Sequence, residues 1–102
     1  MRRLGRFVLT RPSVEDYPGL RRLLQERVII EQLERDWATD NLEYIASGEA
    51  FEEVEPGANV PAYMVLVHLG HEEGDVYREV PFEIEFEPAK PGDPPMTWIR
   101  ND

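Results

Sequence analysis

The stretch AYMVLVHLGHEEGDVYREVPFEIEFE, residues 62 to 87, decides the fold, because its two halves predict the strands of a hairpin. Residues 62 to 69 are apolar at nearly every position, as is typical of a central strand buried on both faces. In residues 80 to 87, apolar side chains alternate with acids, which predicts one buried face and one solvated face. The inward set is Phe82, Ile84 and Phe86, and the outward set is Glu83, Glu85 and Glu87. Pro81 favours an edge strand or a bulge.

The segment HLGHEEGD, residues 68 to 75, connects the two halves. A loop from His71 to Gly74 would pair Val65 with Val80 and Tyr63 with Phe82. We interpret it as a hydrated hairpin tip without a metal, because two histidines three apart at a strand end do not present their nitrogens on one face. The alternative is a small enzyme or a metal- or ligand-binding domain. It would use His68, Tyr77 and neighbouring glutamates such as Glu79 and Glu83.

The N-terminal third predicts a strand followed by a long helix. Residues 3 to 11 form the expected strand, and Pro12 stops it. The apolar spacing from Leu20 to Trp37 predicts the helix, with Asp16 favoured as its N-cap. Its apolar stripe moves by roughly a third of a turn after Ile29, so this helix is expected to bend, to be buried on more than one side or to meet a partner. The displaced residues are Ile30, Leu33 and Trp37.

The remaining segments are shorter. Capping signals predict a second helix from Asn41 to Ser47. Residues 52 to 61 are expected to be a loop, residues 89 to 95 a proline-rich linker, and residues 96 to 100 a last strand. The expected fold is one α+β domain over residues 1 to 102, with a three- to four-stranded, mainly antiparallel sheet and one long and one short helix on one face.

The formal net charge of −10 is unevenly placed along the chain. Residues 1 to 35 contain eight arginines and five acids, whereas residues 36 to 102 contain three bases and sixteen acids. The acidic part would be repelled by phosphate, so direct binding to nucleic acid is not expected. No apolar run approaches the ~20 residues that span a bilayer. With no cysteine for a disulfide or a thiolate site, we expect a cytoplasmic protein without a cofactor.

Enzyme motifs are scarce. There is no cysteine nucleophile, and no glycine-rich phosphate loop occurs. The segment VLTRPSVEDYPGLRRLLQE, residues 8 to 26, resembles the opening strand and first helix of the GNAT acetyltransferases, which implies acetyl-CoA binding. The acetyl-CoA loop of that family, an Arg or Gln followed by glycines ahead of a helix, is missing from the sequence. We therefore do not expect an enzyme.

These observations favour a non-catalytic acidic protein that binds or regulates another protein, one with a basic, nucleic-acid-binding face. One form of this hypothesis is a nucleic-acid-mimicking inhibitor of phage or mobile-element type. Alternate residues of a strand lie about 6.6 to 6.8 Å apart, roughly two axial steps along a DNA strand. The alternatives are an ordinary solvated strand face and a structural subunit, and the moving apolar stripe is also compatible with a homodimer. The expected contact residues are Glu72, Glu73, Asp75, Glu79, Glu83, Glu85, Glu87, Ile30, Leu33 and Trp37.

Overall fold

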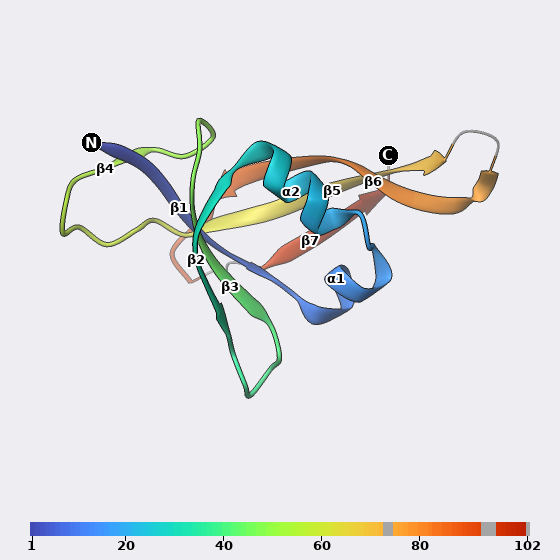
Figure 1. Cartoon of the computed structure of the whole chain (residues 1–102), viewed down its shortest axis with the longest axis horizontal. Helices are drawn as coiled ribbons and strands as arrows, with labels where there is room; N and C mark the ends of the chain where they lie inside the picture. The colour runs from blue at the N-terminus through green and yellow to red at the C-terminus, as the bar shows by residue number, and fades with distance from the viewer. Residues whose placement is uncertain (73–74, 93–95, 102) are drawn as a thin grey trace.

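The computed structural model describes residues 1–72, 75–92 and 96–101, with the side chains in these ranges other than those of residues 72, 75 to 78, 100 and 101. In this part of the chain, two short helices follow the first strand, and only strands come after them (Figure 1). In order they are β1 (Arg2–Leu9), α1 (Arg11–Asp16), α2 (Leu20–Arg27), β2 (Ile29–Arg35), β3 (Leu42–Ser47), β4 (Glu53–Val54), β5 (Tyr63–Glu72), β6 (Asp75–Pro88) and β7 (Thr97–Asn101). The predicted α+β class is confirmed. The strands form two sheets, in the orders β2-β3-β1-β4 and β6-β5-β7.

The predicted hairpin is present as β5 and β6, but its register differs from the expected one. Val65 lies opposite Phe86 and not Val80, and Tyr63 lies opposite Pro88 and not Phe82. Register shifts after His68 and after His71 take up the difference, and residues 73 and 74 of the expected loop lie outside the described residues. Because the displacement at Val65 is an even number of residues, Ile84 and Phe86 stay on the predicted inner face.

Phe82 departs from the predicted alternation. His68 pairs with Glu83 and Leu69 pairs with Pro81, so Phe82 is the extra residue of a β-bulge. Its exposed fraction is 53%, against 2% for Ile84. The prediction that Phe82 points into the core is therefore wrong. Pro81 gives the physical reason, because proline cannot donate to the ladder and is accommodated at bulges and edges.

The long helix predicted from Leu20 to Trp37 is also wrong. Helix α2 ends at Arg27, and the chain continues as β2, which lies at the edge of the four-stranded sheet. The β-branched run Val28-Ile29-Ile30 favours extended backbone over helix. The displacement of the apolar stripe marks the change from helical to strand periodicity and not a bend.

The second predicted helix, from Asn41 to Ser47, is strand β3. Tyr44 and Ala46 alternate inward with exposed fractions of 3% and 0%, and β3 pairs with both β1 and β2. The hydrogen bonds to two neighbouring strands and the burial of one face stabilise the strand more than a local capping signal stabilises a helix. Asp16 is not the N-cap of α2 either. It ends α1, and Gly19 precedes α2.

Other predicted segments are confirmed with small changes. The first strand is β1, and the last is β7, which pairs with β5 in parallel. The predicted loop at residues 52 to 61 contains the two-residue strand β4 and a turn at Gly57, whose φ is 84°. This left-handed conformation favours glycine.

The core lies between the two sheets and α2. Its central aromatic residue, Phe51, lies 4.9 Å from the ring centroids of both Tyr63 and Phe86. The sheets meet where β1 passes the start of β5, because the Arg6 backbone N–H donates to the Pro61 carbonyl at 2.9 Å. Figure 1 shows the β5–β6 hairpin extending to one end of the molecule and the β2–β3 hairpin projecting to the side. The buried cluster is Phe7, Leu9, Leu20, Leu24, Val28, Tyr44, Ala46, Phe51, Tyr63, Val65, Val67, Leu69 and Ile84.

Candidate binding surfaces

The side of the β6-β5-β7 sheet that faces away from the core carries the predicted acids, and we call it the outer face. Strand pairing places its residues in rows, because paired residues of neighbouring strands point to the same side. One row contains Glu85, Leu66 and Trp98. Glu87 and Met64 form the next row, and Glu83 and His68 form the row on the other side. The outward orientation predicted for the three glutamates is thus confirmed.

Trp98 and Leu66 differ sharply in exposure. Leu66 is 3% exposed although it lies on the outer face, whereas its neighbour Trp98 is 51% exposed. Neighbouring side chains therefore shield Leu66 from water, and the indole of Trp98 remains half accessible. Tryptophan side chains are enriched in protein interfaces and among the residues that dominate their binding energy.

Two of the outer glutamates have a basic side chain nearby. His68 Nε2 lies 3.2 Å from Glu85 Oε1, and Arg27 Nη2 lies 3.3 Å from Glu83 Oε1. Within the described residues, no cation lies at ion-pair distance from Glu87 or Glu79. Among the described side chains of the outer face, Glu83 is therefore compensated by an arginine, whereas Glu79 and Glu87 are not.

The other expected acidic contacts are only partly described. Glu79 is exposed and lies opposite His71 near the hairpin tip. The backbones of Glu72 and Asp75 pair with each other, but their side chains and that of Tyr77 lie outside the described residues, as does the whole of Glu73. The structure places His68 opposite Glu83.

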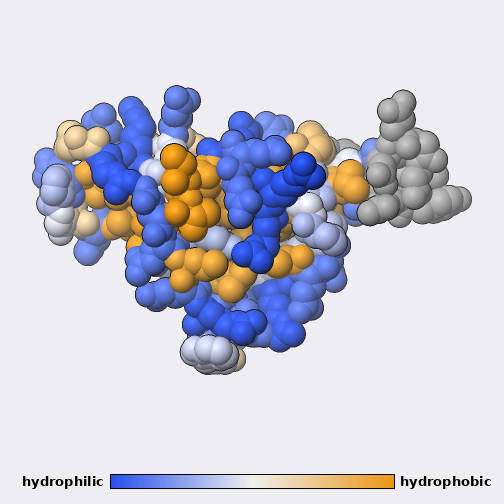
Figure 2. Space-filling view, viewed as in Figure 1, coloured by the Kyte–Doolittle hydropathy of each residue, from blue (hydrophilic) through white to orange (hydrophobic). Residues whose placement is uncertain are grey.

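The apolar residues expected to form a helical stripe do not form one. Ile30 is partly buried against the core, and Leu33 is 43% exposed on β2. Trp37 lies in the turn after β2, is 83% exposed and has the Arg35 guanidinium 5.3 Å from its ring centroid. Figure 2 shows that apolar side chains on the face in view reach the surface in small groups among hydrophilic ones.

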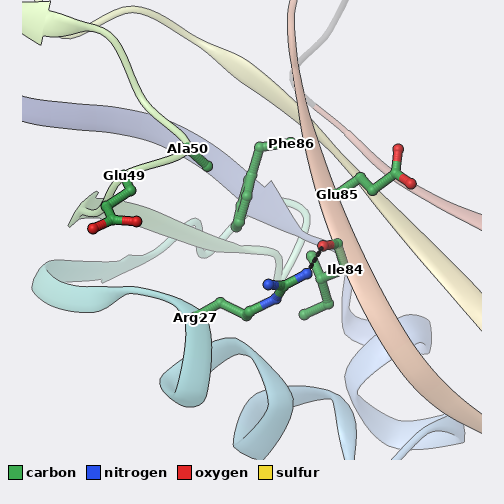
Figure 3. A pocket seen from close by; sticks show the side chains of 6 residues that line it. All are labelled: Arg27, Glu49, Ala50, Ile84, Glu85 and Phe86. Carbon is green, nitrogen blue, oxygen red and sulfur yellow. Dashed lines mark hydrogen bonds between the residues drawn. The ribbon is translucent and has the colours of Figure 1, made fainter.

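A cleft of about 410 Å³ lies beside β6, between the end of α2 and the turn that follows β3. Arg27 reaches across it and donates from Nη2 to the Ile84 carbonyl at 3.3 Å (Figure 3). In Figure 3, Phe86 lies on the same side of β6 as Arg27, whereas Glu85 lies on the other side. Arg27 thus covers part of the exposed backbone of an edge strand. The cleft is lined by Arg27, Glu49, Ala50, Ile84, Glu85 and Phe86.

A second cavity, of about 200 Å³, lies among α1, α2 and the β2–β3 hairpin. It brings together arginines from three elements, which sequence reasoning missed. The only signal in the sequence was the excess of arginine in the first 35 residues, and no spacing rule connects these positions. The lining residues are Arg11, Val14, Glu15, Arg21, Arg35, Asp40 and Leu42.

The described residues offer no ready-made metal centre, since none of their histidine, aspartate and glutamate side chains form a group of three or more that could hold an ion. Of the helices described, neither is long and apolar enough to cross a membrane. Comparisons of this chain with protein-family models, with curated proteins and with solved structures found no match.

Proposed function

We propose that this protein is a non-catalytic binding protein whose outer face holds a protein partner with a basic surface. The observation that carries the proposal is the row of Glu85, Leu66 and Trp98, in which a half-exposed tryptophan lies next to a buried leucine that in turn neighbours a carboxylate. Interfaces obtain most of their binding energy from a few such aromatic anchors, and the surrounding polar rim excludes water.

Charge supports a basic partner. The chain carries a net charge of −10, and Glu85 and Glu87 are exposed on the outer face. Complementary potentials steer association and penalise acidic competitors, so such a surface selects basic partners. A nucleic-acid-binding protein is one class with the required charge, and an inhibitor that occupies its phosphate-binding surface is one form of this proposal.

The pairing of Glu83 with Arg27 limits how far the acidic surface acts as a phosphate mimic. Arg27 holds Glu83 at the edge of the sheet, so Glu85 and Glu87 are the outer-face acids most open to a partner. An exposed ion pair contributes little stability, and a partner's arginine could replace Arg27 beside Glu83 at small cost.

Affinity capture from a lysate of the source organism tests the proposal with three baits. The first is the wild-type chain, the second carries Glu85→Lys and Glu87→Lys, and the third carries Glu52→Lys and Glu55→Lys. The control changes net charge by the same amount at exposed acids away from the outer face. We expect a basic protein, with a pI above about 9, to be retained by the wild type and the control and lost by the outer-face variant. Equal retention by all three baits, or retention of no basic protein, would refute the proposal.

A further inference from the structure

The cavity among α1, α2 and the β2–β3 hairpin is unusual in an acidic protein, because three guanidinium groups line it. Two of them are occupied. Arg11 binds Glu15 at 2.6 Å and also binds Asp40, and Arg35 binds Asp40 at 2.7 Å. These pairs neutralise both carboxylates of the cavity.

Arg21 is the third guanidinium, and in the described part of the chain no carboxylate lies at ion-pair distance from it. The cavity therefore retains one uncompensated positive charge. Its neighbour on the same helix, Arg22, does not line the cavity. Arg21 and Arg22 carry the same charge and lie on one helical turn. They differ because only Arg21 lines the cavity.

Tyr44 lies beside Arg21 but does not line the cavity. The residue is 3% exposed, and its hydroxyl is buried. Burial raises the pKa of Tyr44, whereas the positive charge of Arg21 and a hydrogen bond with its side chain oppose that rise. The Arg21 side chain therefore lies near the buried hydroxyl and also lines the cavity.

We infer that this cavity binds a phosphate-type oxyanion, which accepts hydrogen bonds from the Arg21 guanidinium. A planar guanidinium matches the oxygens of phosphate and binds them through charge-assisted hydrogen bonds. The volume of about 200 Å³ accommodates inorganic phosphate or the phosphate group of a small ester. This site lies on different elements from the outer face, and its inference does not rest on the proposed protein partner.

Isothermal titration with inorganic phosphate tests the inference, with sodium chloride used to hold ionic strength constant. We expect saturable binding to the wild type at millimolar phosphate or below and binding at least about tenfold weaker to Arg21→Gln, since a charge-assisted hydrogen bond is removed. Arg22→Gln is the matched control, because it removes the same charge one residue away, and its dissociation constant should stay within about twofold of the wild type.

A second titration with glycerol phosphate separates the two sources of the anion. Tighter binding of the ester than of inorganic phosphate assigns the site to a phosphorylated metabolite, and the reverse assigns it to the free ion. The inference is overturned if neither compound shows saturable binding up to about 20 mM, a concentration at which even a very weak site would fill. It is equally overturned if Arg21→Gln and Arg22→Gln bind phosphate alike.

Discussion

Phe51 packs directly over the backbone of Gly5, so that a Cβ built on Gly5 would lie 2.4 Å from Phe51 Cδ1. No real Cβ contact is that short, and the obstructing atoms, Cδ1, Cε1 and Cγ, belong to a rigid aromatic ring. Phe51 is 1% exposed and contacts the rings of Phe7, Tyr63 and Phe86. The absence of a side chain at Gly5 thus allows one aromatic residue to join strands of both sheets.

Replacing Gly5 with alanine should therefore destabilise the protein strongly. We expect the free energy of unfolding to fall by about 2 to 4 kcal/mol, because the buried ring has to move within a packed core. Urea denaturation followed by circular dichroism measures the change. Gly19→Ala is the control, since its Cβ would meet only Pro81 Cγ at 3.8 Å, and it should change stability by less than about 1 kcal/mol. Similar losses in both variants would contradict the packing described for Phe51.

The bulge in β6 predicts unequal roles for two apolar residues that are two positions apart. Ile84→Ala should cost about 2 to 4 kcal/mol of stability, because it opens a cavity in the core. Phe82→Ala should cost less than about 1 kcal/mol, because the ring is already half in water. Denaturant titration of the two variants checks the register. A larger loss of stability for Phe82→Ala than for Ile84→Ala would contradict the bulge and favour the unbroken alternation expected from the sequence.

The free energy of unfolding at alkaline pH depends on the pKa of Tyr44. Burial raises its pKa above the ordinary value of 10.0 in the folded state, so the unfolded chain loses this proton first as pH rises. The stabilising contribution is present below about pH 10 and is lost as pH rises above that value, through the folded pKa. We expect the stability of the wild type to fall more steeply than that of Tyr44→Phe between about pH 9.5 and 11, whereas at pH 7 the two should agree within about 1 kcal/mol. Parallel pH profiles would show that Tyr44 ionises as freely in the folded protein as in the unfolded chain.

Much of the second half of the fold could be predicted from the sequence, because it depends on local patterns. Alternation over residues 80 to 87 identified the inward Ile84 and Phe86, and the apolar run at residues 62 to 69 identified the central strand. The failures lie where tertiary pairing overrides local preference. Residues 29 to 35 and 42 to 47 carry helical spacing or capping signals, yet they become strands because β3 gains ladders on both sides.

In the candidate sites, too, features set by local patterns could be predicted, whereas features set by tertiary pairing could not. The outward direction of Glu83, Glu85 and Glu87 follows from strand periodicity alone. The position of Trp98 beside Leu66 depends on a parallel pairing between strands that are distant in sequence, and no local pattern specifies that register. The meeting of Arg11, Arg21 and Arg35 likewise depends on how two helices pack against a hairpin.

The two tryptophans of the chain provide the most direct test of the outer face. Once a basic partner is captured, its dissociation constant should be measured by surface plasmon resonance for the wild type, Trp98→Ser and Trp37→Ser, with circular dichroism to verify that each variant is folded. Both indoles are exposed, but only Trp98 lies on the outer face. We predict that Trp98→Ser weakens binding by at least about 30-fold, as expected for an interface anchor worth about 2 kcal/mol, and that Trp37→Ser changes it by less than about twofold. Equal effects of the two substitutions, or a larger effect of Trp37→Ser, would contradict the assignment of the outer face as the binding surface.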